Sequence, residues 1–324
     1  MREYILLSEN TVYKIGVNPK GQLCLSQAEG EESVKHRELT KTPCRKFSAD
    51  IDASGVIHIA AVIGKTLTYL RIHNEKTSTT HLMHLPDGFN ISSVIINADV
   101  NLRLNYCVKG KDGSAVIEYE LQGDSWQGKN VYTTDAVMEL VCAKKGENKC
   151  YGIKKEGQMN LLFNAYKPDE IIFSSSSKIE YCQATAEGIV FLNNSTAYSG
   201  SKELSAAEGV FVCDSRRILA KNEGHLREYS LFDGVRFSGE VAMPRGAKEY
   251  VLCCSCEDKR IIISSPFPFI KTTLARAGNG GLMQEVYIQQ RALFSLQAEL
   301  KSLKNRVRKL EEEMRKNTNI NLQR

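Results

Sequence analysis

The first residues that could do chemistry are histidines and cysteines at the short spacing of metal ligands. His81 and His84 are separated by two residues, and segment 253–256 (CCSC) contains a Cys-x-x-Cys pair. On a strand, side chains three residues apart point to opposite faces, so we expect the two histidines to diverge. A structural zinc site needs a second pair of ligands nearby, and none follows residue 256. We therefore predict no metal or cofactor, and we interpret the ten cysteines as reduced core thiols.

Acidic residues are the second group, because glycoside hydrolases use two carboxylates that face one cleft. Asp50, Asp52, Glu118 and Glu120 are candidates, but their spacing singles out none of them. The sequence contains no phosphate-binding loop, nucleophile elbow, zinc-protease motif or dinucleotide-binding glycine pattern. We therefore favour a protein without catalytic activity and keep a glycoside hydrolase or lyase as the alternative, whose catalytic residues the sequence does not identify.

The elements that would position such residues are strands. Residues 1–272 contain short runs of β-branched and aromatic residues, each about 5–8 residues long, which is the signature of strands. Segments rich in Gly, Asn and Asp separate them, and these residues are typical of turns. The fold class predicted for residues 1–272 is therefore all-β.

The strand runs form a repeat. Segments 47–88 and 92–135 share one order of four strands, and similar units open near Val137, Lys178, Gly209 and Tyr250. A four-stranded unit that recurs about every 40–45 residues predicts a β-propeller, here with six or seven blades. We expect the short unit 178–208 to lack a strand, and segment 4–17 to pair with C-terminal strands and close the ring. A β-sandwich or two small β-domains are the alternatives.

One repeat carries a pattern of polar residues. Segment 51–60 (IDASGVIHIA) supplies Asp52, Gly55 and His58, and Tyr69 lies on the next strand. This pattern resembles a blade of the sialidase/BNR-type propellers, and the resemblance implies the propeller fold and contact with glycans. A sialidase-like site also needs an arginine cluster and a Tyr–Glu pair, for which 118–120 (EYE) and 227–229 (REY) are candidates. We interpret His58 as a hydrogen-bonded core histidine and Trp126, the single tryptophan, as a packing residue rather than a sugar platform.

The C-terminal segment differs in character. Residues 273–283 form a Gly-rich linker, 284–316 a predicted coiled-coil helix and 317–324 a disordered tail. Apolar residues there follow the alternating spacing of three and four that is typical of a coiled-coil seam. The residues that we assign to oligomerisation are Val286, Leu293, Leu296, Leu300, Leu303, Arg306, Val307, Leu310, Glu311 and Met314.

Segment 306–311 (RVRKLE) matches the pattern R-h-x-x-h-E, which resembles the trimerisation motif of parallel three-stranded coiled coils. Arg306 would pack along the seam and reach Glu311 of the adjacent helix. We therefore expect self-association through this helix, with a trimer favoured and a dimer as the alternative.

The net charge of +5 is mild and predicts no nucleic-acid partner. The N-terminus lacks the long apolar run of an export signal, and no run reaches the ~20 apolar residues of a membrane span. We expect a soluble cytoplasmic protein, or a virion component, without membrane contact. The predicted function is a binding or interaction module, multiplied by the coiled coil, with a glycan, a surface polymer or a protein as ligand. A phage-tail-like component and an intracellular scaffold subunit both fit this description.

Overall fold

The computed structural model describes residues 4–8, 11–29, 33–98, 101–144, 147–185, 187–214, 217–222, 225–231, 234–242, 260–263 and 270–273. The chain divides into two units, residues 1–273 and 274–324, and every described residue belongs to the first. The predicted linker, the coiled-coil helix with its oligomerisation residues, and segment 253–256 lie outside the described residues. All elements of the described part are strands, as the all-β prediction requires.

Within the described residues, six four-stranded antiparallel sheets follow one another in sequence. Sheet 1 contains β1 (Tyr4–Ser8), β2 (Thr11–Val17), β3 (Leu23–Glu29) and β4 (Ser33–Glu38). Sheet 2 contains β5 (Cys44–Ile51), β6 (Ile57–Ile63), β7 (Thr66–His73) and β8 (Lys76–His84). Sheet 3 contains β9 (Asn90–Ala98), β10 (Leu102–Lys109), β11 (Ser114–Gln122) and β12 (Ser125–Thr134).

The remaining sheets repeat the same up-and-down order. Sheet 4 contains β13 (Val137–Ala143), β14 (Cys150–Glu156), β15 (Met159–Asn164) and β16 (Lys167–Ser175). Sheet 5 contains β17 (Ile179–Thr185), β18 (Gly188–Asn193), β19 (Thr196–Ser199) and β20 (Lys202–Ala206). Sheet 6 contains β21 (Gly209–Asp214), β22 (Arg217–Asn222), β23 (His225–Ser230) and β24 (Arg236–Ala242), and a separate pair joins β25 (Arg260–Ile263) to β26 (Ile270–Thr273). Six sheets of four strands resemble a six-bladed β-propeller.

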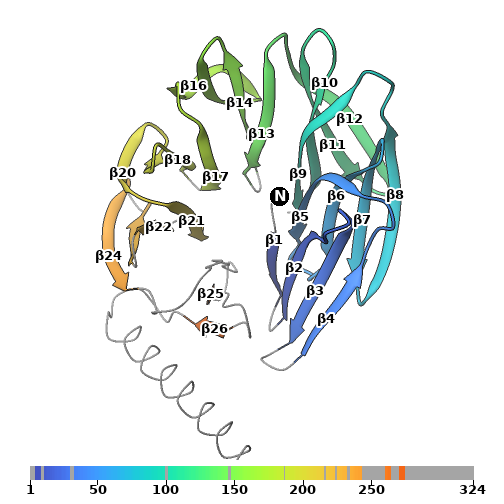
Figure 1. The fold of residues 1–324 in the computed structure, drawn as a ribbon, viewed down its shortest axis with the longest axis horizontal. Coiled ribbons are helices and arrows are strands. Elements are labelled where there is room, and N and C mark those ends of the chain that lie inside the picture. Colours follow the sequence, from blue (N-terminus) through green and yellow to red (C-terminus); the bar gives the residue numbers. More distant parts are fainter. Residues whose placement is uncertain are drawn as a thin grey trace, which may run out of the picture. The chain divides into compact units, whose positions relative to one another are not determined.

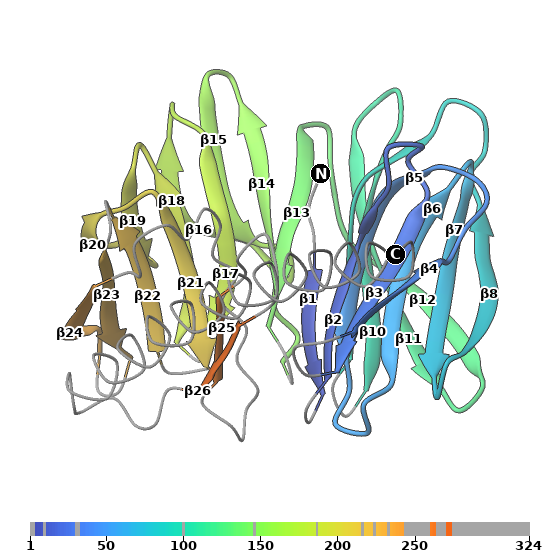
Figure 2. The same ribbon diagram turned by 60° about the horizontal axis from the view of Figure 1, so that its bottom comes forward.

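The first strands of successive sheets, from β1 to β21, are neighbours in space although they belong to different sheets (Figures 1 and 2). Side chains therefore supply hydrogen bonds that a continuous sheet would make through its backbone. The Ser48 hydroxyl in β5 accepts a hydrogen bond of 3.1 Å from the backbone N–H of Ile96 in β9. The Ser93 hydroxyl in β9 accepts one of 2.6 Å from Leu140 in β13. Small polar residues on the inner strands thus fix each sheet to the next.

Each central strand contributes to two cores, because successive side chains point to opposite faces of a sheet. In β6, Ile59 and Ala61 pack between sheets 1 and 2, whereas Ala60 and Val62 pack between sheets 2 and 3. Comparable clusters lie between sheets 3 and 4, 4 and 5, and 5 and 6. This burial on both faces explains why the central strands are nearly continuous apolar runs.

β-Bulges recur at the same places in successive sheets. Where the first strand pairs with the second, single residues are left without a cross-strand partner: Arg45 in β5, Ser92 in β9, Val141 in β13 and Cys213 in β21. The outer strands carry a second set: Leu82 in β8, Val131 in β12, Leu204 in β20 and Ser238 in β24. Of these, Leu82, Val131 and Leu204 pack against the cores between sheets. A bulge also twists an edge strand and hinders pairing with another chain.

The bulge at Leu82 overturns the prediction for the two histidines. His81 lies opposite Thr68 and His84 lies opposite Thr66, and these two threonines share one face of β7. The extra residue therefore brings His81 and His84 to the same face, where the Nδ1 of each lies 3.3 Å from its threonine hydroxyl. Among the described residues, no group of three or more His, Cys, Asp or Glu side chains is placed to bind a metal ion.

Two topological predictions are also wrong. Segment 4–17 forms β1 and β2, which pair with each other and with β3 in sheet 1 rather than with C-terminal strands. Unit 178–208 has four strands, although β19 contains only four residues and β20 only five. The repeat is therefore more regular than the sequence suggested.

The core-thiol interpretation is confirmed for four cysteines. Cys44, Cys107, Cys150 and Cys182 are buried and free, and Cys24 and Cys142 are half-buried and free. Burial raises the pKa of the Cys44 thiol to about 11 and also raises that of Cys150. These two buried thiols are therefore protonated at neutral pH and react poorly.

Candidate functional site

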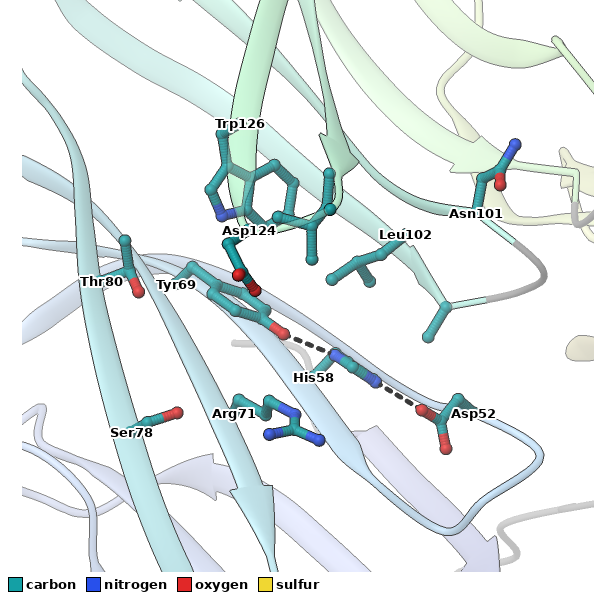
Figure 3. Close-up of a pocket in the computed structure, with 13 residues that line it drawn as sticks. Asp52, His58, Tyr69, Arg71, Ser78, Thr80, Asn101, Leu102, Asp124 and Trp126 are labelled. Carbon is teal, nitrogen blue, oxygen red and sulfur yellow. Dashed lines mark hydrogen bonds and ion pairs between the residues drawn. The ribbon is translucent and has the colours of Figure 1, made fainter.

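A polar cleft of about 540 Å³ lies between sheets 2 and 3, at the end of the sheets where β5 and β9 finish (Figure 3). Sheet 2 and its turns contribute Asp52, His58, Tyr69, Arg71, Ser78 and Thr80. Sheet 3 and its turns contribute Ala98, Asn101, Leu102, Leu121, Gly123, Asp124 and Trp126. We call this space the sheet 2–3 cleft, and its volume falls within the usual range of small-ligand sites, about 300–1,000 Å³.

The turn between β5 and β6 positions Asp52. Its Oδ1 accepts hydrogen bonds of 2.9 Å from the backbone N–H groups of Ser54 and Val56, which is how an aspartate stabilises a tight turn. Gly55 adopts a φ of 77°, a conformation that glycine takes without steric cost. The other carboxylate oxygen, Oδ2, lies next to His58.

His58 connects Asp52 to Tyr69 (Figure 3). Its Nε2 lies 2.9 Å from Asp52 Oδ2, and its Nδ1 lies 2.7 Å from the Tyr69 hydroxyl. A carboxylate can only accept, so Nε2 carries the proton. In neutral His58 the Nδ1 atom is then the acceptor, and the Tyr69 O–H donates to it. The tyrosine oxygen keeps a lone pair that can accept a hydrogen bond from a ligand.

The surroundings lower the pKa of Asp52 at one end of these hydrogen bonds and raise the pKa of Tyr69 at the other end. Burial alone would raise the pKa of Asp52, but hydrogen bonds from His58 and Val56 outweigh it and hold the pKa below its ordinary value. Burial raises the pKa of Tyr69 to about 12, although the positive charge of Arg71 acts against it. At neutral pH Asp52 is therefore a carboxylate and Tyr69 a protonated phenol.

Arg71 and Asp124 face the cleft from opposite sheets without partners. Arg71 is exposed on β7, and Asp124 is exposed in the turn between β11 and β12. Neither side chain makes a hydrogen bond or ion pair with another residue in the described part of the chain. The cleft thus offers one free cation and one free anion to whatever enters it.

Trp126 closes one side of the cleft. Its ring meets the Tyr69 ring edge-on, with 5.0 Å between centroids and 68° between planes. It is half-buried against the core between sheets 2 and 3, which agrees with the predicted packing role. Because it also lines the cleft, Trp126 combines packing with a position in which an aromatic face can contact a ligand.

The boundary between sheets 3 and 4 contains a polar cluster instead. Glu118, whose side chain is 2% exposed, accepts a charged hydrogen bond of 2.7 Å from Lys129. The Tyr166 hydroxyl donates to the other Glu118 oxygen and lies 3.2 Å from the amide oxygen of Asn105. Tyr166 packs on the core between these sheets, so protein side chains satisfy Glu118 completely.

The other candidate carboxylates also have structural roles. Asp50 accepts a hydrogen bond of 2.8 Å from the backbone N–H of Ala98 in the next sheet. Glu120 forms an ion pair of 3.1 Å with Arg103, which lowers the pKa of that carboxyl. Segment 227–229 lies in β23 of sheet 6 and segment 118–120 in β11 of sheet 3, so the structure does not bring them into one site. Of the four candidate carboxylates only Asp52 lines the cleft.

No protein-family model matches the chain, and no curated protein sequence matches it. Solved structures do match. Oligogalacturonate lyase in complex with manganese is 9% identical, with a TM-score of 0.56 and coverage of 82% of this chain and 86% of that one. The fucose-recognising Aleuria aurantia lectin, a six-bladed β-propeller, is 12% identical, with a TM-score of 0.43 over 75% of this chain and 96% of that one. TolB from Acinetobacter baumannii is 10% identical, with a TM-score of 0.44 over 70% and 63%.

The match to oligogalacturonate lyase, with its TM-score of 0.56, supports a shared fold and nothing finer. At such identities a shared fold does not carry a shared ligand, because function depends on the site rather than on the architecture. The sialidase-type resemblance of segment 51–60 stays a prediction. Within the described residues no helix is long and apolar enough to cross a membrane.

Proposed function

We propose that the protein is a non-catalytic binding module whose sheet 2–3 cleft binds a carbohydrate. The observation that carries this proposal is the open cleft itself, in which Arg71 and Asp124 have no partner among the described side chains. Polar groups that face a concave site without partners are the usual means by which a protein fixes the orientation of a small ligand.

The chemistry of the lining fits a polyhydroxylated ring. Asp124 can accept from sugar hydroxyls, and Arg71 and Asn101 can donate to hydroxyl or ring oxygens. Trp126 and Tyr69 supply apolar surface for the C–H face of a sugar. This mixture of one aromatic wall and several convergent polar groups distinguishes the cleft from the hydrophobic clusters between the sheets.

Catalysis is less well supported by the same groups. A glycoside hydrolase needs two available carboxylates, and both oxygens of Asp52 already accept hydrogen bonds. Both ring nitrogens of His58 are engaged, and a Tyr69 pKa of about 12 leaves no phenolate to act as a base at neutral pH. Of the carboxylates that line the cleft, only Asp124 is without a hydrogen bond from another described residue.

We further propose that the C-terminal helix multiplies this site. A trimer through the heptad of residues 286–314 would place three weak sites on one stalk and raise avidity through effective concentration. We also propose that the protein is cytoplasmic and serves in a scaffold or a phage-tail-like assembly.

The binding proposal can be tested with the full chain on a glycan array, followed by titration of Trp126 fluorescence with each glycan that binds. Trp126 is the only tryptophan, so the signal reports on the cleft alone. Arg71→Ala should weaken binding about tenfold or more, because a charge-assisted hydrogen bond contributes about 1.5–3 kcal/mol. Lys109→Ala, at the opposite end of sheet 3, is the matched control. Turnover of a bound glycan that Asp124→Asn abolishes would instead support the hydrolase alternative.

The stalk proposal has its own test. Light scattering of the full chain should give a trimer, and Leu303→Glu combined with Leu310→Glu should give a monomer, because both residues lie in the predicted seam. Asn305→Glu, at a position that the heptad places outside the seam, should leave the trimer intact. A native chain that is monomeric contradicts the avidity proposal.

A further inference from the structure

Sheets 2, 3, 4 and 5 share a two-residue turn between their third and fourth strands. The pairs that close these turns are His73–Lys76, Gln122–Ser125, Asn164–Lys167 and Ser199–Lys202. The second residue of the turn is therefore Glu75 in sheet 2, Asp124 in sheet 3, Tyr166 in sheet 4 and Ser201 in sheet 5. These four residues hold the same place in the strand order of their sheets, although only Glu75 has a positive φ, of 63°.

At two boundaries this turn residue reaches back to the preceding sheet. Glu75 forms an ion pair of 3.2 Å with Lys35 of sheet 1. Tyr166 donates its hydroxyl hydrogen bond to Glu118 of sheet 3, and its ring packs on the core between the sheets. Asp124 and Ser201 make no such contact with any described residue, and the cleft lies in front of Asp124 (Figure 3). The open cleft is thus a place where a side chain such as that of Tyr166 is missing.

The acceptors at the two boundaries are equivalent as well. Glu118 lies four residues before the closing residue Gln122, and Tyr69 lies four residues before His73. Glu118 accepts the hydrogen bond of the Tyr166 phenol. Tyr69 donates its own proton to His58 and presents a free lone pair, so it too is an acceptor. No described residue donates a hydrogen bond to the Tyr69 oxygen in the way that Tyr166 donates one to Glu118.

We infer that the ligand enters the sheet 2–3 cleft as a single six-membered ring that bears a hydroxyl, in the place that the Tyr166 ring takes at the next boundary. Its O–H donates to the Tyr69 oxygen, as the Tyr166 O–H donates to Glu118. A cavity of about 150 Å³ already holds benzene, so 540 Å³ has room for one such ring and its substituents. This inference rests on the proposed binding role of the cleft, and it identifies the part of a glycan that is recognised as a terminal monosaccharide ring.

The test places the missing side chain in the chain itself. Asp124→Tyr in the full-length protein should fill the cleft with a phenol ring and shift the emission of Trp126 in the absence of ligand. Phenol, benzene and a panel of methyl glycosides are then titrated against Trp126 fluorescence. We expect phenol and at least one glycoside to bind the native protein, phenol more tightly than benzene, and both to bind Asp124→Tyr at least about tenfold more weakly. Asp112→Tyr, the same substitution at the opposite end of sheet 3, is the control and should titrate like the native protein.

A second variant keeps the inference falsifiable if Asp124→Tyr does not fold. Tyr69→Phe retains the ring but loses the acceptor, and it should remove the preference of the cleft for phenol over benzene. Phenol binding without any glycoside binding supports the ring position and refutes the carbohydrate proposal. Glycoside binding that Asp124→Tyr leaves unchanged refutes the ring position and leaves the carbohydrate proposal standing. If none of the probes changes the fluorescence of Trp126, both the ring position and the carbohydrate proposal are refuted.

Discussion

Tyr166→Phe is the substitution that tests most directly how sheets 3 and 4 are joined. It removes one hydroxyl group and leaves the ring in the core. Glu118 then keeps its ion pair with Lys129 on one carboxylate oxygen and loses the hydrogen bond on the other. With a side chain that is only 2% exposed, Glu118 has little access to replacement water.

The expected cost follows from that geometry. A hydrogen bond to a charged group contributes about 1.5–3 kcal/mol to stability, compared with about 0.5–1.5 kcal/mol for a neutral pair. We therefore expect Tyr166→Phe to lower the free energy of unfolding by about 1.5–3 kcal/mol. In the Glu118→Gln background the same change should lower the free energy of unfolding by at least about 1 kcal/mol less, because the acceptor is then neutral.

Urea unfolding of the four proteins in this double-mutant cycle measures the coupling between the two side chains. Tyr198→Phe serves as the control, because Tyr198 stacks on Phe191 and makes no hydrogen bond with another described residue. It should change stability by no more than about 0.5 kcal/mol. An equal cost of Tyr166→Phe with and without the Glu118 carboxylate would show that Tyr166 does not stabilise that charge, and the comparison with Asp124 would lose its basis.

Three further predictions concern the cleft, a thiol and a glycine. The folded-state pKa of Asp52 lies below its unfolded value of about 3.9, so the stability that this carboxylate contributes is present above that pH and is lost as pH falls through the folded pKa. The His58→Gln variant should therefore lose less stability than the native protein when the pH falls below about 4 in acid-unfolding curves. Identical losses in the two proteins would contradict a stabilising hydrogen bond between His58 and Asp52. Burial raises the pKa of Cys150, so iodoacetamide at pH 8 should leave its peptide unmodified in mass spectra until the protein unfolds, and rapid labelling of the native state contradicts that burial. A Cβ added to Gly128 would lie 2.1 Å from the Tyr119 ring, so Gly128→Ala should cost about 1–3 kcal/mol in thermal or urea unfolding, and a neutral result means that the ring moves freely.

The repeat could be predicted from the sequence because two local signals agree. The alternation and apolar content of the strands mark their extent, and Gly, Asn and Asp mark the turns. The units expected to open at residues 47, 92, 137, 178 and 209 correspond, to within three residues, to sheets that begin at Cys44, Asn90, Val137, Ile179 and Gly209. Burial on both faces made the central strands conspicuous as apolar runs.

The bulges could not be predicted in the same way. A residue without a cross-strand partner has no characteristic type: the bulged positions include Arg45, Ser92 and Val141. Each bulge shifts the alternation by one residue, so an argument from spacing fails wherever one intervenes. That is why His81 and His84 share a face although they are three residues apart.

The site was half visible in the sequence. The pattern of Asp52, Gly55 and His58 with Tyr69 on the next strand identified three residues that the structure joins by hydrogen bonds. Arg71 and Asp124 could not be associated with them, because they face each other only across a boundary between sheets. The usable signal was weaker: the second residue of these turns is glutamate, aspartate, tyrosine or serine, so the residue type at this position differs from sheet to sheet.

That difference has an evolutionary consequence. In sheet 3 the closing pair Gln122–Ser125 and the left-handed conformation of Gly123 set the shape of the turn, and Asp124 bonds to no other described side chain, so it can change without the loss of such a contact. A single codon at this position can then decide whether a boundary is sealed from within or left vacant for an outside molecule. A chain of this kind can gain, lose or relocate a recognition site by one substitution, at a cost in stability set by the contacts of the residue that is replaced.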